Sequence, residues 1–331
     1  MPEAPLLLPA NQPTDRFYAG GGRIADFRGS SWDGGHVPED WIGSTTCLFG
    51  EPVLGLTTLP DGRVLREAVS GDPEGWLGAP HVARFGADTR LLTKLLDAGQ
   101  RLPVHLHPDG AFAARHLGRA HGKTEAWVFL RGGEVHLGFR EELSAGELRR
   151  LVDEQDIDQL LGSLHRLEVH PGDAVLVPAG TPHAIGAGTF LVEVQEPEDL
   201  SILLEWRDFA LDGERDGHLG LGFDLALEAA DRVARTPAEV EALVRRAGPD
   251  GPVLPELAAS FFRVDRLRGG AAVEPGFAVV VVVAGAGTLR GTSGGWTLPV
   301  RAGETVLVPA GAGAVAVDGD LTALVCRPPL P

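Results

Sequence analysis

Two histidines separated by one residue, His105 and His107, have a spacing that could bind a metal ion. Alternate residues of a β-strand point to the same face, so on a strand both imidazoles would face one side. Two imidazoles at this spacing can bind a single divalent ion. Such a pair on its own is more often a surface or strand-pairing feature, so a metal prediction needs support from elsewhere in the chain.

That support comes from His183, which ends the stretch GDAVLVPAGTPH. The stretch has the form G-x5-P-x-G-x2-H, filled by Gly172, Pro178, Gly180 and His183, and its proline and glycine fix the direction of the histidine. Between the two motifs a carboxylate, Glu125, precedes the apolar strand AWVFL. Three imidazoles and a carboxylate suit Zn²⁺, and Fe²⁺, Mn²⁺, Co²⁺ or Ni²⁺ would also fit. Together the motifs predict a metal centre.

The scaffold around His183 occurs twice in the chain. The stretch GDAVLVPAGTPHA at residues 172–184 has a near copy, GETVLVPAGAGAV, at residues 303–315, where Ala314 stands at the position of His183. In both copies a glycine turn leads into an apolar strand that ends at Pro-Ala-Gly. The offset is the size of a domain and far exceeds solenoid periods, so we predict duplicated all-β domains of which only the first binds a metal.

Two stretches interrupt the strand-like alternation. Residues 141–165 carry leucines at helical spacing, and Ser144 followed by Glu147 is a capping box that opens a helix. Residues 223–248 form the second helical stretch, in which a Thr-Pro pair predicts the start of a new helix. The chain is therefore expected to be mainly β with helical insertions.

The charge balance excludes some classes of partner. The chain has 331 residues, enough for two domains, and carries 46 acidic against 29 basic residues for a formal net charge of -17. An acidic surface repels phosphate backbones and anionic lipids, so neither nucleic acid nor a membrane surface is expected as a partner. An anionic substrate would need a local basic pocket.

The two cysteines, Cys47 and Cys326, lie far apart without CxxC spacing. This argues against a disulfide framework and predicts a reducing, cytoplasmic location. The N-terminal residues lack a basic n-region, so no signal peptide is predicted. The longest apolar run, FAVVVVVAGAG, is far shorter than the ~20 residues of a spanning helix and is expected to be a buried strand.

The HxH strand followed by the G-x5-P-x-G-x2-H element resembles the pattern of cupin barrels. The longer string RLLTKLLDAGQRLPVHLHPD…GKTEAWVFL…GDAVLVPAGTPHAIGAG…LVEVQ resembles the type I mannose-6-phosphate isomerases. The segment RFYAGGGRIADF…PEDWIGST is similar to the opening of that family, and SFFRVDRLRGG onward to its second barrel, which lacks a metal.

The resemblance implies two cupin-type, jelly-roll β-barrels with helical insertions. Residues 1–213 would form a metal-binding cupin domain that contains the helical insertion 141–165. Residues 214–250 would form a helical segment, and residues 251–331 a degenerate cupin domain without a metal.

Carried over to matching positions, the family's four zinc ligands fall on His105, His107, Glu125 and His183. The first departs from the family, which typically has glutamine there, in QVHP where this chain has HLHP. Because an imidazole nitrogen replaces an amide oxygen, we expect stronger metal binding and more electron density on the ion.

Four further residues match family positions. A lysine before a strand, such as Lys123, is usually a solvated charge, but the resemblance implies that it positions substrate or moves a proton. Lys94 also matches a family lysine, and a strand-end or buried ion-paired role fits it equally. Glu193 and Gln195 alternate on the strand after His183, so both point to one face, either as groups behind the metal ligands or as packing residues.

One catalytic position of the family is changed. In the family an arginine follows this strand, in strings such as SDTTYRVYD. The corresponding segment of this chain is PEDLSILLEWRDF. Leu203 therefore stands at the position of the family's arginine. A leucine can neither neutralise charge nor donate a hydrogen bond. Either Arg207, four residues along, replaces that arginine, or the chemistry has shifted.

The resemblance implies a zinc-dependent aldose–ketose isomerase that interconverts mannose 6-phosphate and fructose 6-phosphate, with a sugar phosphate as its small-molecule partner. Lys123, Glu193 and Arg207 are the catalytic candidates. Two alternatives remain at this point: a related metal-dependent cupin acting on an unphosphorylated sugar or as an oxygenase, and a non-catalytic sugar-binding cupin.

Overall fold

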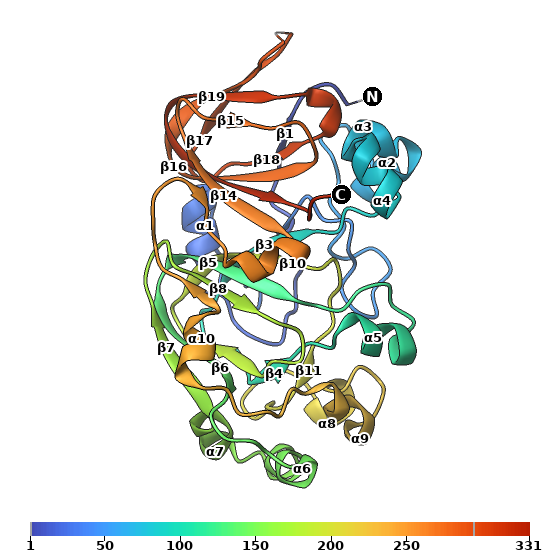
Figure 1. The fold of residues 1–331 in the computed structure, drawn as a ribbon, viewed down its shortest axis with the longest axis vertical. Coiled ribbons are helices and arrows are strands. Elements are labelled where there is room, and N and C mark those ends of the chain that lie inside the picture. The colour runs from blue at the N-terminus through green and yellow to red at the C-terminus, as the bar shows by residue number, and fades with distance from the viewer. Residues whose placement is uncertain (1, 294) are drawn as a thin grey trace.

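The computed structural model describes residues 2–293 and 295–331 and consists mainly of β-strands in three sheets, as Figure 1 shows. Within these residues no sheet closes on itself through its hydrogen bonds. The mainly β prediction is therefore confirmed, and the two-barrel arrangement stays a prediction.

The six-stranded sheet has the order β12-β8-β5-β10-β3-β2. Its strands are β2 (Glu39–Ile42), β3 (Leu92–Asp97), β5 (Glu125–Arg131), β8 (Ala174–Val177), β10 (Phe190–Gln195) and β12 (Val244–Arg245). The five-stranded sheet has the order β11-β4-β9-β6-β7. Its strands are β4 (His105–Leu106), β6 (Gly133–Phe139), β7 (Leu164–Val169), β9 (His183–Ile185) and β11 (Ile202–Leu203).

The eight-stranded sheet contains the path β1-β18-β16-β19-β14-β13, with β15 paired to β19 and β17 paired to β16. Its strands are β1 (Leu6–Leu8), β13 (Gly251–Pro252), β14 (Arg263–Arg268), β15 (Ala272–Val273), β16 (Ala278–Gly291), β17 (Thr297–Arg301), β18 (Thr305–Val308) and β19 (Val315–Arg327). Ten residues of the predicted buried strand FAVVVVVAGAG, 278–287, are the first part of β16, which confirms the strand. Its burial holds for residues 278–282, whereas residues 284–286 are exposed.

Short helices surround the sheets (Figure 1). They are α1 (Arg23–Arg28), α2 (Leu65–Gly71), α3 (Pro73–Leu77), α4 (Ala79–Phe85), α5 (Gly110–Phe112), α6 (Ala145–Glu154), α7 (Ile157–Gly162), α8 (Gly213–Asp216), α9 (Phe223–Ala226) and α10 (Pro237–Glu241). Four further turns of helix are η1 (Ala113–Leu117), η2 (Leu227–Ala229), η3 (Glu256–Ser260) and η4 (Ala310–Ala312). None of the helices in the described residues is long and apolar enough to cross a membrane.

Both predicted helical stretches contain helices, but shorter ones than the leucine spacing suggested. The capping box of Ser144 and Glu147 opens α6, and Gln155 ends that helix in the left-handed conformation at φ 48°. The stretch from residue 223 forms only α9, η2 and α10, and Thr236 caps α10 through a second capping box. The chain then joins the six-stranded sheet as β12.

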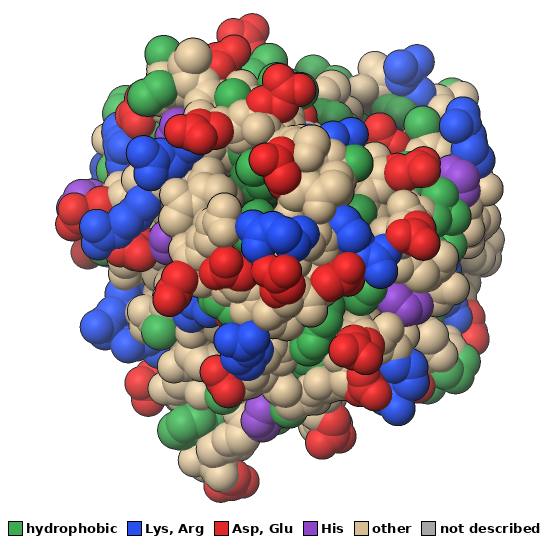
Figure 2. All heavy atoms as spheres, turned by 90° about the horizontal axis from the view of Figure 1, so that it is seen from below, with side chains coloured by type: hydrophobic (Ala, Val, Ile, Leu, Met, Phe, Trp, Pro, Cys, Tyr) green, Lys and Arg blue, Asp and Glu red, His purple; other side chains and the backbone are tan. Residues whose placement is uncertain are grey.

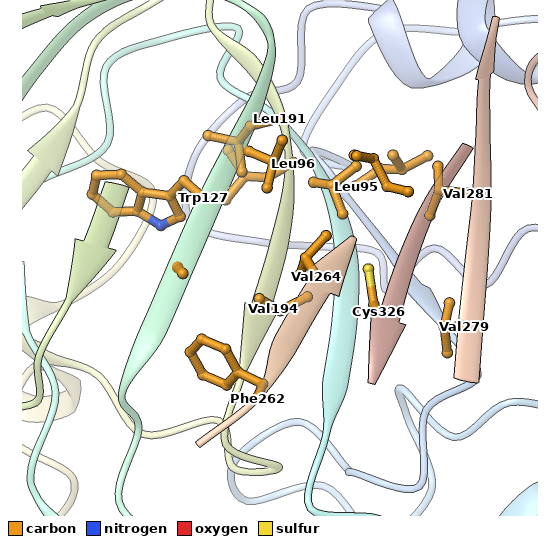
Figure 3. Packing of buried hydrophobic residues seen from close by; sticks show 14 of the residues in the cluster. Leu95, Leu96, Trp127, Leu191, Val194, Phe262, Val264, Val279, Val281 and Cys326 are labelled. Atoms are coloured by element: carbon orange, nitrogen blue, oxygen red, sulfur yellow. The ribbon is translucent and has the colours of Figure 1, made fainter. Parts of the chain in front are cut away.

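The six-stranded sheet is buried on both faces because it separates the polar cavity described below from the main apolar core. Figure 3 shows Leu95 and Val194 of this sheet beside Val264, Val279 and Cys326 of the eight-stranded sheet, and all five belong to one buried cluster. This shared core couples the two halves of the chain. Cys326 and Cys47 are both free thiols.

The sequence repeat is also a structural repeat. β8 and β18 begin at equivalent positions of the two copies, two residues after Gly172 and Gly303, whose φ angles of 89° and 90° require glycine at each turn. In the second copy the residues around β18 pack valines and leucines into an apolar cluster. Ala314 immediately precedes β19.

Two strands pair with a strand in a different part of the chain from the one to which the resemblance assigns them. β1 pairs with β18, so the N-terminal residues complete the eight-stranded sheet, while β12 pairs with β8 in the six-stranded sheet. The division at residues 213 and 250 stays a prediction. On the face seen in Figure 2, acidic and basic side chains are interspersed and do not gather into a basic patch.

We expect Leu95→Ala to lower the free energy of unfolding by about 2–5 kcal/mol, because the deletion leaves a cavity in the core that joins the two sheets. The matched control Leu257→Ala removes a side chain that is 64% exposed and should change it by less than about 0.5 kcal/mol. Urea unfolding measures both. A loss under about 1 kcal/mol for Leu95→Ala would contradict the coupling of the sheets.

Candidate metal centre

The structure brings the three predicted histidines together. His105 on β4 and His183 on β9 lie directly opposite each other in register, and His107 follows β4. One ligand nitrogen of each histidine lies within 4.8 Å of those of the other two, and all three side chains are buried. Among the histidine, cysteine, aspartate and glutamate side chains of the described residues, these three form a cluster that could hold a metal ion.

Each of these imidazoles is oriented by a hydrogen bond from its Nδ1 to a backbone carbonyl. For His105, His107 and His183 the acceptors are Pro103 O at 2.8 Å, Leu200 O at 2.6 Å and Thr181 O at 2.8 Å. In the neutral ring this leaves the Nε2 lone pair free, as in histidines that ligate metals. Nε2 of His183 is buried and has no hydrogen-bond partner. The donor set therefore fits a divalent transition metal.

Burial keeps His105 and His107 neutral. It lowers the pKa of His105 well below its ordinary value, and the neighbouring His183 and His107 lower it further. Burial, followed by the charge of Lys123, lowers the pKa of His107 to about 3. Because a metal binds the unprotonated ring, these side chains are ready to act as ligands at neutral pH.

Glu125, the fourth predicted ligand, reaches the histidines from the opposite sheet. Its Oε2 lies 3.1 Å from Nε2 of His107 and its Oε1 lies 3.4 Å from Nε2 of His183. Burial would raise the pKa of Glu125, but Lys123 and then His107 outweigh it and hold that pKa well below its usual range. Acceptor atoms thus face one another at close range, an arrangement that favours a cation between them.

Lys123 supplies part of that positive charge. Its Nζ donates to Nε2 of His107 at 2.8 Å and to Oε2 of Glu125. The side chain is buried, so Lys123 is not the solvated charge that its sequence context suggested. A metal ion would use the same two acceptor atoms, so the lysine and the ion share one environment.

A cavity lies beside the histidines, and the predicted residues Lys94 and Glu193 are among those that line it. Its polar lining consists of Arg16, Tyr18, Glu39, Lys94, His105, Lys123, Glu125, Glu193, Asp199 and Ser201. Lys94 Nζ lies 3.6 Å from Oε2 of Glu39 and 3.4 Å from Oε1 of Glu193, so Lys94 is a buried ion-paired residue. Burial, followed by the charge of Glu125, raises the pKa of Glu193.

Glu39 is a second buried carboxylate of the cavity. It accepts hydrogen bonds from Tyr18 Oη and from Trp41 Nε1, the latter at 2.6 Å. Burial would raise its pKa, but the positive charges of Arg16 and Lys94 and these hydrogen bonds lower it far below the ordinary value. Glu39 therefore stays ionised and binds the N-terminal segment to the six-stranded sheet.

Besides His107 and His183, three predicted residues lie outside this lining: Gln195, Leu203 and Arg207. Gln195 donates to the carbonyl oxygens of Glu196 and Glu198 and so holds the following loop. Leu203 is buried on β11 directly opposite His105.

Arg207 is exposed, and its guanidinium donates to Glu154 O at the end of α6. The reason is that Gln155 Oε1 accepts the backbone N–H groups of Trp206 and Arg207 at 2.8 and 3.1 Å, which holds this segment away from the cavity. The structure thus does not bring Arg207 to the site, and the expectation that it replaces the arginine at position 203 is corrected here.

Sequence reasoning missed Arg16, Tyr18, Glu39 and Asp199. One local signal could have found Glu39, because Glu39-x-Trp41 on β2 repeats the pattern of Glu125 and the tryptophan two residues after it on β5. In both pairs the indole N–H donates to the carboxylate. For the other three residues no local pattern marks the position, since loops bring them to the cavity.

The chain is similar in sequence to proteins named mannose-6-phosphate isomerase. The chain is 30% identical over 238 residues to a mannose-6-phosphate isomerase of Bacillus subtilis, a match that covers 69% of this chain and 72% of that protein. It is 35% identical over 170 residues to a mannose-6-phosphate isomerase of Streptococcus mutans, a match with 49% of this chain and only 50% of that relative.

Solved structures support the fold. Mannose 6-phosphate isomerase from Bacillus subtilis matches at a TM-score of 0.73 with 24% identity, covering 98% of this chain and 99% of that one. A mutant of phosphomannose isomerase from Salmonella typhimurium matches at 0.75 with 16% identity, covering 99% and 100%. No protein-family model matches the chain.

We expect His183→Ala to abolish stoichiometric binding of Zn²⁺, because it removes one of the converging nitrogens and the backbone-oriented ring that carries it. Metal content after dialysis, measured by mass spectrometry, checks this. His170→Ala, which changes a histidine with a 67% exposed side chain, serves as the control and should retain the metal. One equivalent of tightly bound Zn²⁺ in His183→Ala would contradict the assignment.

We expect the stability difference between the wild type and Glu39→Gln to narrow as the pH falls below about 4.5. Glu39 stays ionised in the folded protein there, whereas in the unfolded chain it binds a proton below its ordinary value of 4.5. The unfolded state then binds more protons, so the stability that this carboxylate contributes is lost with falling pH. Urea unfolding of both proteins at pH 7 and pH 3.5 measures the effect, and a constant difference would contradict it.

Proposed function

The chain belongs to the mannose-6-phosphate isomerase family, and on that premise we propose that it is a zinc-dependent aldose–ketose isomerase that interconverts mannose 6-phosphate and fructose 6-phosphate. One observation carries the proposal: three imidazoles and Glu125 converge beside a cavity that also contains buried lysines and carboxylates. Such a site can both hold a metal and move a proton.

The proposal includes the metal and its ligands. His105, His107, Glu125 and His183 would hold Zn²⁺, and the uncompensated Nε2 of His183 supports this. When bound, the ion supplies Lewis-acid polarisation of a substrate oxygen. The replacement of an amide ligand by His105 gives the site three nitrogen donors, which also suits Fe²⁺ or Co²⁺.

The isomerisation moves a proton between C2 and C1 of the sugar through a cis-enediol. Glu193 is our candidate for the base, because it lines the cavity and its raised pKa brings a carboxylate closer to the pH at which proton transfer is efficient. Lys94, 3.4 Å from Glu193, would hold the carboxylate in place. Lys123 would contact the sugar oxygens at the metal end of the cavity. Arg207 is not part of this proposal.

The proposed architecture is a pair of cupin-type barrels. The six- and five-stranded sheets, which supply the metal ligands, would form the two layers of a first jelly roll in residues 1–213, and residues 251–331 would form a second without a metal. Between them, residues 214–250 would contribute connecting helices and β12. The matching positions of β8 and β18 support this proposal, as does the apolar cluster of the second copy.

We expect the zinc-loaded protein to convert mannose 6-phosphate to fructose 6-phosphate, detected with a coupled enzymatic assay, and to lose this activity on chelation. Lys123→Met should lower kcat by about 100-fold or more, since it removes a positioned donor from the reaction centre. His170→Ala should retain full activity.

Conversion of free mannose alone would replace the sugar phosphate by an unphosphorylated sugar as the substrate. No turnover of either sugar by a metal-loaded protein would overturn the isomerase proposal and favour an oxygenase or a sugar-binding protein.

A further inference from the structure

Leu203 occupies the position where the family has an arginine, and Arg207 does not reach the cavity. Another arginine does, from a distant part of the chain: Arg16, in the N-terminal segment, lines the same cavity as His105 and Glu193. We propose that Arg16 binds the phosphate group of the substrate and provides the positive charge that Leu203 cannot. This inference rests on the proposed function.

The guanidinium of Arg16 is only loosely paired. Its Nη2 lies 3.5 Å from Oε1 of Glu39 and 3.8 Å from Oδ1 of Asp199, well beyond the ~2.7–2.9 Å of a charge-assisted hydrogen bond. Its Nε is buried and has no hydrogen-bond partner. An arginine has five N–H donors, so most of the donor capacity of Arg16 is unused in the described structure.

The two other cations of the cavity are less accessible to solvent. Lys94 lies between Glu39 and Glu193 and over the ring of Trp41, and its side chain is 3% exposed. Lys123 is bonded to a proposed metal ligand on each side, and its side chain is 5% exposed. The side chain of Arg16 is 11% exposed, so this cation lies nearest to solvent.

The order of exposure along the cavity agrees with the two ends of a sugar phosphate. The reacting carbons of the substrate must lie at the histidine end of the cavity, and the phosphate is at the other end of the six-carbon chain. His107, His183 and Glu125 are at most 1% exposed and His105 is 7% exposed, whereas the side chain of Arg16 is 11% exposed. The planar fork of a guanidinium can bind two phosphate oxygens at once, which an ammonium cannot.

The carboxylates beside Arg16 permit this exchange of partners. Glu39 keeps its contacts with Tyr18, Trp41 and Lys94 when Arg16 turns toward a phosphate, so this carboxylate stays compensated. Asp199 accepts the backbone N–H of Phe49 at 3.1 Å. The ligand proposed for Arg16 is therefore the phosphate group of a sugar phosphate monoester.

The backbone holds Arg16 in place at this entrance. Its N–H donates to His36 O at 3.0 Å, and Nδ1 of His36 lies 2.7 Å from the carbonyl oxygen of Arg16. Asp15 has a φ of 60°, a left-handed conformation that turns the chain immediately before Arg16. The main chain is thus fixed while the guanidinium remains free to change partners.

The test compares Arg16→Met and Arg16→Lys with two controls. Arg207→Met removes the arginine that lies outside the cavity, and Arg290→Met removes one that is paired with Asp318 on the eight-stranded sheet. The dissociation constant of inorganic phosphate is measured by calorimetry on the zinc-loaded proteins and on His183→Ala. The KM and kcat for mannose 6-phosphate are measured in parallel, with metal content and Tm as checks of folding.

We expect Arg16→Met to weaken phosphate binding about tenfold or more and to raise KM for mannose 6-phosphate more than it lowers kcat. Arg16→Lys should fall between Arg16→Met and the wild type, and both controls should match the wild type. Phosphate binding that persists in His183→Ala would show that the anion is not held by the metal.

Unchanged phosphate affinity in a folded Arg16→Met would overturn the inference, as would a wild type that binds no phosphate. A larger loss in Arg207→Met would transfer the role to that residue. If Arg16→Met does not fold, the affinity of Arg16→Lys decides. Phosphate binding that depends on Arg16 without any turnover would uphold this inference and defeat the proposed isomerase instead.

Discussion

Burial of ionised groups is the constraint on which the rest of the structure depends. Five ionisable side chains of the cavity lie on or beside the inner face of the six-stranded sheet and are 4% exposed or less: Glu39, Lys94, Lys123, Glu125 and Glu193. An unpaired charge at that depth costs several kcal/mol, so each must have partners that arrive from elsewhere. Indole N–H groups on the same strands, the N-terminal segment and the histidines of the facing sheet meet this requirement. The opposite face of the sheet is apolar and packs on the C-terminal half, which holds these charges in position.

Local patterns predicted what local geometry determines. The alternation of His105 and His107, and the turn before His183, placed three imidazoles on one side of two neighbouring strands, and the structure brings them together. The repeat likewise predicted two equivalent strands, β8 and β18. Positions that depend on long connections could not be read in this way. Arg16 enters the cavity through a turn far from the motifs, and Arg207 is drawn to α6 by a glutamine that no motif includes.

The duplication separates a scaffold from its chemistry. Both copies retain a positive-φ glycine, a four-residue buried strand and the proline that ends it. What differs is the filling: the first copy surrounds histidines with carbonyl acceptors, whereas the second packs valines and leucines around β18. An apolar filling needs no compensating partners, so the second copy gains stability from the same strands that the first uses to hold charge.

The pairing of β1 with β18 has a consequence for how the protein is made. Residues 6–8 of β1 are synthesised about 300 residues before their partner strand at residues 305–307. At ribosomal rates of about 5–20 residues per second, the first strand waits roughly 15–60 s before it can pair. During translation the eight-stranded sheet therefore forms late. A product truncated before β18 would leave the edge of β1 unpaired and the apolar face of the six-stranded sheet uncovered, and both would be open to aggregation. Synthesis of β18 is the step that lets the first strand pair.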